Sequence, residues 1–241
     1  MQTPNRFPGV SVIIPARNEE EAISAAIRSA RAAGACEVIV ADGGSTDGTV
    51  EAARPHADRV ISSPPGRGRQ MNAGARVSGG EILLFLHADT TLPESSLAGV
   101  QRALSREEVV GGAFRVRLGV SADAPFARRI ALRITGGMIG IRSRLFRSFT
   151  GDQAIFLRRE AFVRIGGYPE IPLMEDVELS RRMTLAGKTV LLPCRLTTSA
   201  RRWEEHGTAR TILRMWRLRI AYRLGMPPER CAEIYGRKPN R

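Results

Sequence analysis

Short apolar runs alternate with helical stretches between residues 10 and 89, and glycine, proline, aspartate or asparagine stands at each junction. The runs predict strands at residues 10–15, 37–41, 59–62 and 81–87. The stretches between them predict helices at residues 19–33 and 70–77. A third, short helix is predicted directly after the turn at residues 42–49, with Ser45 or Thr46 as its N-terminal cap. This β-α-β-α order is typical of a mostly parallel, Rossmann-like sheet flanked by helices, so the predicted fold class is α/β.

The second half of the chain has a weaker pattern. Strands are predicted at residues 109–117, 154–158 and 189–192, together with a helix at residues 175–186 that Gly187 ends. Residues 128–149 form a basic stretch with glycines, and residues 208–225 form a basic amphipathic helix. With 241 residues, the chain is long enough for one large core. We expect one domain over residues 1–205, with the helix and tail of residues 206–241 packed on or beside it.

The cellular compartment is constrained by cysteine usage and apolar runs. Cys36, Cys194 and Cys231 are far apart and odd in number, which suits a reducing compartment. Residues 1–9 lack the apolar stretch of a secretory signal, and the longest strongly apolar run, residues 82–86, is too short to span a bilayer. The sequence predicts a cytoplasmic protein, with peripheral attachment to the inner face of the membrane as an alternative.

The net charge is +13 and comes almost wholly from arginine, because Lys188 and Lys238 are the only lysines. Arginine favours planar, bidentate contacts with phosphate or carboxylate. Nucleic acid, anionic lipid or a phosphorylated substrate would each explain the excess, and so would arginine-biased codon usage with solvated faces.

An aspartate follows the most apolar predicted strand. Ligands of parallel sheets bind beyond the carboxyl ends of the strands, and Asp89 lies at such an end. A carboxylate there can hold a magnesium or manganese ion that also takes diphosphate oxygens. The alternative is a turn former or helix cap.

The 42–49 turn follows the second predicted strand. Asp42 ends that strand as a hydrogen-bond acceptor, and Gly44 lets the backbone approach a ligand. A tight turn before a capped helix needs the same residue types. Because Asp89 follows two strands later at the same edge, the pair favours a cleft with two carboxylates.

Glu175 and Asp176 open the predicted helix at residues 175–186. Carboxylates are favoured there by the helix dipole alone. The functional alternative is a general base, which takes the proton of an acceptor hydroxyl while a metal stabilises a departing diphosphate.

Two basic clusters complete the candidates. Arg67 and Arg69 lie in the loop before residue 70 and can reach a diphosphate. Residues 201–203, of sequence Arg-Arg-Trp, stand close to His206. His206 is either a further metal ligand, a phosphate contact or an ordinary surface histidine.

These motifs, taken in order, resemble the family 2 glycosyltransferases of the GT-A fold over most of residues 10–205. The segments that carry the resemblance are VIIPARNEE at 12–20, DGGSTDGT at 42–49, RQMNAG at 69–74, FLHAD at 85–89, GDQ at 151–153, GGYPE at 166–170 and MEDVEL at 174–179. Their number and order make the resemblance far more specific than any single motif.

The resemblance implies an inverting, hexosyltransferase-type enzyme that moves a sugar from a nucleotide-diphosphate sugar to a hydroxyl acceptor, with a lipid among the candidate acceptors. It implies that Asp89 is the ligand of Mn²⁺ or Mg²⁺ and that Asp176, next to Glu175, is the catalytic base. No nucleic acid is expected. The predicted donor-binding residues are Pro15, Ala16, Arg17, Glu19, Asp42, Gly44, Arg67, Arg69, Asn72, His87, Ala88, Arg202 and Trp203.

Two positions depart from the family pattern. His87 replaces the first aspartate of the metal motif, and Gly43 replaces the second aspartate of the usual Asp-Asp-Gly-Ser turn. Imidazole favours softer ions than magnesium, so His87 is expected to orient Asp89 or the ribose, with His206 as a distant candidate ligand. The His-Ala-Asp motif resembles a bacterial subgroup associated with radical-SAM or selenodomain genes.

The amphipathic helix at residues 208–225 has two interpretations. It lies in an anionic membrane surface, or it docks on the domain with its arginines in water or on carboxylates.

Two rival functions also remain. A sugar-nucleotide nucleotidyltransferase would want a glycine-rich loop after the first strand, where this chain has Arg17-Asn18-Glu19-Glu20. A non-enzymatic basic protein that binds membrane or nucleic acid would leave Asp42, Asp89 and Asp176 unexplained.

Overall fold

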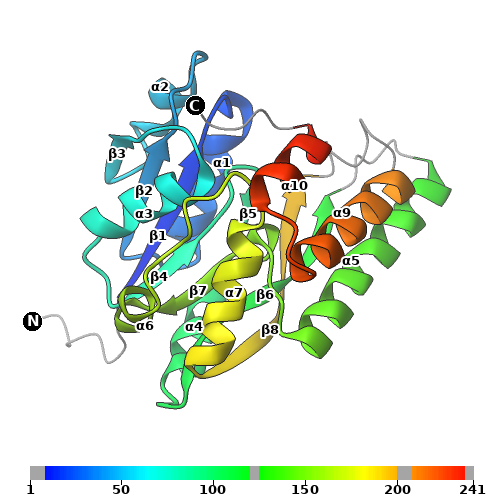
Figure 1. Cartoon of the computed structure of the whole chain (residues 1–241). Coiled ribbons are helices and arrows are strands. Elements are labelled where there is room, and N and C mark those ends of the chain that lie inside the picture. Colours follow the sequence, from blue (N-terminus) through cyan, green and yellow to red (C-terminus); the bar gives the residue numbers. More distant parts are fainter. Residues whose placement is uncertain (1–8, 120–124, 200–207, 237–241) are drawn as a thin grey trace, which may run out of the picture.

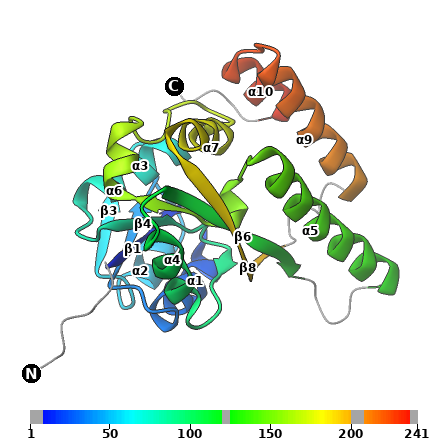
Figure 2. The ribbon, with the colours of Figure 1, turned by 90° about the horizontal axis from the view of Figure 1, so that it is seen from below.

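The computed structural model describes residues 9–119, 125–199 and 208–236. One eight-stranded sheet runs through it in the order β3-β2-β1-β4-β7-β6-β8-β5, with helices on both faces (Figures 1 and 2). Its strands are β1 (Val10–Ala16), β2 (Glu37–Asp42), β3 (Arg59–Ser62), β4 (Ile82–Phe85), β5 (Thr90–Thr91), β6 (Val109–Gly119), β7 (Ile155–Arg158) and β8 (Lys188–Ser199). The predicted α/β class with a mostly parallel central sheet is confirmed.

The helices connect these strands and extend the chain beyond them (Figure 1). They are α1 (Glu20–Ala32), α2 (Thr49–Ala53), α3 (Arg67–Val77), α4 (Ser96–Leu104), α5 (Phe126–Phe146), the 3-10 turn η1 (Gly151–Gln153), α6 (Arg159–Arg164), α7 (Glu175–Ala186), α9 (Thr208–Arg223) and α10 (Pro228–Tyr235). Among the helices in the described ranges, none is both long and apolar enough to cross a membrane.

Strands β1 to β4 form a parallel block whose carboxyl ends meet at one edge. In register, Ala16 at the end of β1 stands beside Asp42 at the end of β2. Alternate β1 side chains enter opposite cores, since Val12 packs toward α1 and Ile13 packs toward α3. A Cβ at Gly74 of α3 would come within 2.4 Å of the Ile13 side chain, so this helix needs glycine to lie so close to the sheet.

Beyond β4 the sheet becomes mixed. Strand β7 is antiparallel to β4 and β6, while β6 and β8 are parallel. Strand β8 is much longer than the predicted 189–192, and its pairing with β6 skips Pro193 and Cys194, between Leu192 and Arg195. Proline cannot donate to a ladder and is confined to edges and bulges, which is why the apolar run alone predicted only the first part of this strand.

Two helix starts differ from the predictions. Helix α3 begins at Arg67, with Gln70 N–H donating to the Gly66 carbonyl at 2.9 Å, so Arg67 lies in a first helical turn and not in a loop. Helix α2 begins at Thr49, whose N–H donates to Asp47 Oδ1 at 3.1 Å. The expected cap by Ser45 or Thr46 is therefore wrong, because Asp47 lies closer to the exposed N–H groups.

The basic stretch at residues 128–149 is mostly helix α5, which the sequence pattern did not predict. Its inner face packs on β6 through Leu132, Val116 and Leu118, and a Cβ on Gly136 would lie 3.1 Å from the Val116 carbonyl. Small and polar residues on that face allow the close approach. They also remove the apolar periodicity that normally predicts a buried helix face.

Helix α9 docks on the rest of the molecule, as one of the two interpretations expected. Leu218 is 3% exposed and packs with Met174 and Val177 at the start of α7, and with Cys231 of α10. Figures 1 and 2 show α9 beside α5. The proposed boundary at residues 205 and 206 falls outside the described residues, so the division into 1–205 and 206–241 stays a prediction.

Candidate active site

The two loops that follow β1 and β2 are bound to each other by side chains. Asn18 has a positive φ of 54°, and its Oδ1 accepts the Thr46 N–H at 2.9 Å. Its own N–H donates to Ser45 Oγ at 3.0 Å. The Glu19 N–H donates to Thr49 Oγ1 at 2.8 Å. The predicted nucleotide-binding segments thus form one preorganised edge, with Asn18 as a residue that the sequence did not single out.

Asp42 organises its own turn at this edge. It is 7% exposed, and its carboxylate accepts the N–H groups of Gly44 at 3.0 Å and Ser45 at 3.1 Å. Gly44 has a φ of 83°, which favours glycine. Pro15 and Ala16 are buried in β1, whereas Arg17 is exposed beside the turn. The structure therefore brings together the first six predicted donor-binding residues, Glu19 included.

Gln70 fastens α3 to both strand ends. Its Nε2 group donates to the carbonyls of Ala16 and Ala41, each at 2.8 Å, and the side chain is 4% exposed. A Cβ on Gly43 would lie 2.8 Å from the Gln70 amide, so glycine is needed at that position. A side chain at position 43 would displace the Gln70 amide from its hydrogen bonds with Ala16 and Ala41.

The remaining residues predicted on α3 face the segment before α7. Arg67 Nη1 lies 3.9 Å from Glu175 Oε1, and Arg69 Nε lies 3.3 Å from Glu170 Oε2. Asn72 exchanges two hydrogen bonds of 2.9 Å with the backbone of Tyr168. Arg67 is therefore aimed at the start of α7, while Asn72 uses its amide to hold the turn at residues 166–170.

His87 is 9% exposed and joins β4 to the turn η1. Its Nδ1 lies 3.1 Å from Asp152 Oδ1. A Cβ on Gly151 would come within 2.2 Å of His87 Nε2, so the imidazole packs directly on that glycine. His87 therefore orients Asp152, a residue that the sequence analysis noted only as part of a motif. Ala88 is buried beside it.

Asp89 lies between β4 and β5, where its backbone is fixed. Its carbonyl accepts the Ser199 N–H at 3.0 Å, and the next residue, Thr90, donates its hydroxyl to Thr198 Oγ1 at 2.9 Å. The Asp89 carboxylate faces a cavity of about 90 Å³ that Asp152 also lines. The fold thus places two carboxylates, 63 residues apart in sequence, on one cavity.

Asp176 and Glu175 begin α7, after Met174 in a left-handed conformation with φ 71°. Asp176 Oδ2 accepts the Gly151 N–H at 2.9 Å, and Oδ1 accepts the Val177 N–H at 2.7 Å. Glu175 is 4% exposed. Asp176 is therefore tied to the same three-residue turn that carries Asp152.

Tyr168 lies behind these carboxylates. Burial, followed by the charges of Asp176 and Glu175, raises the pKa of the Tyr168 hydroxyl well above its ordinary value. Its ring contacts Phe85 edge-on at a centroid distance of 4.9 Å. The phenol therefore remains neutral and forms part of the floor beneath the start of α7.

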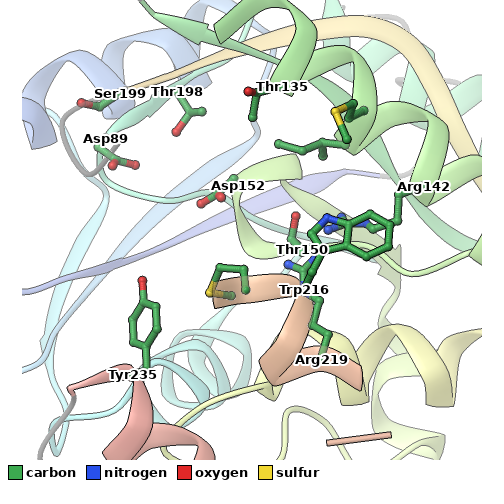
Figure 3. A pocket seen from close by; sticks show the side chains of 13 residues that line it. Asp89, Thr135, Arg142, Thr150, Asp152, Thr198, Ser199, Trp216, Arg219 and Tyr235 are labelled. Carbon is green, nitrogen blue, oxygen red and sulfur yellow. The ribbon is translucent and has the colours of Figure 1, made fainter. Parts of the chain in front are cut away.

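One side of the cavity is formed by helices α5, α9 and α10, which we call the helical wall (Figure 3). Burial lowers the pKa of Arg142, while Asp176 and Asp152 act in the opposite direction. The residues that line the helical wall are Thr135, Met138, Ile139, Arg142, Met215, Trp216, Arg219 and Tyr235.

The donor set of the cavity fits a hard divalent ion. Asp89 and Asp152 offer carboxylate oxygens, and magnesium commonly takes one or two carboxylates together with substrate phosphates. No cluster of three or more His, Cys, Asp or Glu residues suited to a metal occurs within the described ranges. A metal would therefore need oxygen atoms from a bound substrate. His206, Arg202 and Trp203 lie outside the described residues.

The mixed sheet with helices on both faces matches the GT-A fold of solved glycosyltransferase structures. The chain belongs to glycosyl transferase family 2, whose profile matches residues 11–166.

A solved structure of a known enzyme has the same fold. A mannosyltransferase from Pyrobaculum calidifontis, solved in complex with GDP-Man and Mn²⁺, has a TM-score of 0.62 at 21% identity, covering 96% of this chain and 70% of its own.

Two curated relatives are similar in sequence. The probable glycosyltransferase YdaM of Bacillus subtilis is 26% identical, over 91% of this chain and 55% of its own length. The PGL/p-HBAD biosynthesis glycosyltransferase of Mycobacterium bovis is 31% identical, over 67% of this chain and 63% of its own. The chain therefore spans less than two thirds of either relative. Membership of the narrower His-Ala-Asp subgroup stays a prediction.

Proposed function

We propose that this chain is an inverting, hexosyltransferase-type enzyme that transfers a sugar from a nucleotide-diphosphate sugar to an acceptor hydroxyl. The observation that carries the proposal is the placement of three carboxylates around the turn η1. Asp152 belongs to the turn, Asp89 shares its cavity, and Asp176 accepts the Gly151 N–H. A metal-diphosphate site and a base are the two groups that such a transfer requires.

The donor nucleotide binds at the edge formed by the loops after β1 and β2. Polar groups there are already fixed by hydrogen bonds between Asn18, Ser45 and Thr46, so little ordering is needed when base and ribose bind. Arg67, 3.9 Å from Glu175, lies between this edge and the start of α7. The structurally similar mannosyltransferase binds GDP-Man, which supports a nucleotide sugar as donor.

Asp89 and Asp152 would hold the divalent metal, Mn²⁺ or Mg²⁺. When bound, the ion would neutralise the charge that develops on the departing nucleoside diphosphate. His87 acts through Asp152, because its Nδ1 is engaged 3.1 Å from that carboxylate. This assigns His87 the orienting role expected from the sequence, with Asp152 as its target instead of Asp89.

The reaction is a single in-line displacement. The acceptor oxygen forms a bond to the anomeric carbon, the bond from that carbon to the diphosphate oxygen breaks, and the diphosphate leaves with the electron pair. Asp176 takes the acceptor proton. Its two backbone donors, Gly151 and Val177, fix the carboxylate plane while each oxygen keeps a second lone pair for that proton.

Donor binding and turnover test this proposal. Calorimetry with UDP-sugars and GDP-sugars, with and without Mn²⁺, is expected to show metal-dependent binding and slow donor hydrolysis. Asp89→Ala and Asp152→Ala are each expected to weaken that binding by at least about tenfold, whereas the exposed neighbour Glu94→Ala leaves it unchanged. Pyrophosphate release from a nucleoside triphosphate and a sugar phosphate would instead identify a nucleotidyltransferase. Salt-sensitive binding of nucleic acid without donor binding would identify a non-enzymatic basic protein.

An anionic membrane surface is the proposed location, at the inner face of the membrane. Helix α9 docks through Leu218, yet Leu213, Ile220 and Leu224 remain more than half exposed. The exposed apolar residues of α5 are Ile130, Ile134, Met138, Ile141, Leu145 and Phe146. Arg144, Arg217 and Arg223 are exposed on the same helices. Apolar side chains flanked by arginine are typical of helices that bind anionic lipid, and such a location would favour a lipid acceptor.

Vesicle sedimentation tests this location. The protein is expected to sediment with vesicles of phosphatidylglycerol and phosphatidylcholine, and to be released by salt. Ile220→Ser with Leu224→Ser is expected to reduce that binding, while Val163→Ser, an exposed site on α6, does not. Equal binding to pure phosphatidylcholine would contradict the electrostatic part of the proposal.

A further inference from the structure

Two arginines of the helical wall have buried donors that no group in the described part of the chain satisfies. The Nε atoms of Arg142 and Arg219 are buried without a hydrogen-bond partner among the described residues. Among the described residues, five buried side-chain polar atoms lack a hydrogen-bond partner. Two of the five belong to Arg142 and Arg219, which line the same cavity. A buried donor that lacks a partner is costly. Because both arginines also line one cavity, their guanidinium groups indicate that a ligand in that cavity supplies acceptors.

The two arginines lie on helices that pack against the rest of the molecule. Arg142 Nη2 makes only long contacts of 3.4 Å, to Ser143 Oγ, the Ser148 carbonyl and Gln153 Oε1. Arg219 follows Leu218, which fixes α9 against α7. Each arginine therefore retains donor capacity on a packed helix, which suits an anion site.

These arginines lie on the side of the cavity away from the nucleotide-binding edge. Four strands separate β2, which carries Asp42, from β8, which lines the cavity through Thr198 and Ser199. In Figure 3 Asp89 lies near Thr198 and Ser199, Asp152 is next, and Arg142 and Arg219 lie beyond it. A ligand on these arginines would thus approach the carboxylates from the side away from the nucleotide-binding edge.

We infer that Arg142 and Arg219 form a second phosphate subsite, which holds a phosphate group of the acceptor and is separate from the donor diphosphate. The inference rests on the proposed function, since it makes the acceptor a phosphate ester. A phosphate monoester suits the site because two guanidinium groups match a dianion with several acceptor oxygens.

The source of that phosphate is either a soluble ester or a lipid. Met138 and Trp216 line the cavity and are 43% and 42% exposed, so they form an apolar rim between the cavity and the surface. An ester with acyl chains would cover this rim, whereas a small soluble ester would not. The two sources share the phosphate chemistry and differ only in what contacts Met138 and Trp216.

Calorimetry with matched phosphate probes tests the subsite. Inorganic phosphate, glycerol 3-phosphate and monomeric dihexanoyl phosphatidic acid are titrated into the full chain saturated with UDP and Mn²⁺. Arg142→Lys and Arg219→Gln are each expected to weaken binding of all three by about tenfold or more. Arg133→Gln, on the exposed face of α5 and outside the cavity, is the matched control and leaves binding unchanged. Circular dichroism and thermal melting confirm that each variant is folded.

The outcomes separate this inference from the proposed function. No UDP binding by the unsubstituted chain would overturn the proposed function, whereas UDP binding without phosphate binding would overturn only the subsite. Competition between phosphate and UDP, or loss of UDP affinity in Arg219→Gln, would also overturn it, because the arginines would then hold the donor. Tighter binding of the short-chain lipid than of glycerol 3-phosphate supports the subsite and identifies a lipid phosphate, while equal binding supports it and identifies a soluble ester.

Discussion

The nucleotide-binding edge and the helical wall differ in whether their polar side chains have hydrogen-bond partners within the protein. At the edge, the backbone supplies hydrogen-bond partners to the side chains of Asp42, Asn18 and Gln70. In the wall, Arg142 and Arg219 keep buried donors without partners in the described structure. A satisfied network fixes a shape before any ligand arrives, whereas unsatisfied donors are stabilised only when a ligand binds. The difference indicates that one region is a prebuilt framework and the other is a surface completed by its substrate.

Asp176 lies where these two regions meet, and its replacement should have the largest effect. Asp176→Asn keeps the side-chain shape and still accepts one backbone N–H, but it removes the base. We expect turnover to fall by about 10²–10⁴-fold with little change in donor affinity. Steady-state kinetics combined with calorimetry would measure both. A parallel loss of donor affinity would show that Asp176 belongs to the donor site instead, and unchanged turnover would remove its catalytic assignment.

Gln70 tests whether the edge is a framework. Gln70→Ala removes donors to Ala16 and Ala41 from a side chain that is 4% exposed. We expect the free energy of unfolding to fall by about 2 kcal/mol, as measured by urea denaturation. Glu51→Ala, exposed on α2, serves as the control. Unchanged stability in Gln70→Ala would contradict the view that satisfied polar groups hold this edge together.

The edge was largely predictable from sequence, because its signals are local. Asp42 directly follows the apolar run of β2, and Asp89 follows that of β4 by three residues, so both positions could be predicted from the strand pattern. The wall was not predictable in the same way. Arg142 and Arg219 are 77 residues apart, and only the fold brings them to one cavity.

Pairings over long sequence distances also explain the other omissions. Asp152 was missed as a site residue because its partner, His87, belongs to a distant strand. Helix α5 was missed because most of its apolar residues are exposed, while Thr135, Gly136 and Ser143 are buried beside Leu132, which departs from the usual pattern. A prediction from periodicity assumes that the apolar face of a helix is the buried one. In α5 the exposed face carries most of the apolar residues, so the assumption fails.

Asp58 should make the stability of the framework depend on pH, because it stabilises the framework through its charge. Its carboxylate accepts the Val38 N–H at 2.7 Å and pairs with Arg31. Burial tends to raise the pKa of Asp58, but the hydrogen bonds from Arg31 and Val38 outweigh it and hold the pKa below its ordinary value. A depressed pKa gives stability that is present above the unfolded pKa and is lost as the pH falls through the folded one.

Asp58→Asn is therefore expected to cost about 1 kcal/mol at pH 7, since the ion pair is partly exposed. The difference from the unsubstituted chain should shrink below about pH 4. Urea denaturation at pH 7 and at pH 3 would measure it. A difference that stays constant across this range would mean that the contribution is not electrostatic.

The smallest expected effect on stability belongs to the wall. Leu145 is 70% exposed on α5, whereas Leu83 is fully buried in β4. Leu145→Ser should change the free energy of unfolding by less than about 0.5 kcal/mol, while Leu83→Ser should cost at least about 3 kcal/mol because it leaves a cavity and buries a hydroxyl. The same substitution at Leu145 should still reduce binding to anionic vesicles. A large loss of stability at Leu145 would mean that the outer face of α5 is part of a packed core, and the contrast between a framework and a ligand-completed surface would no longer hold.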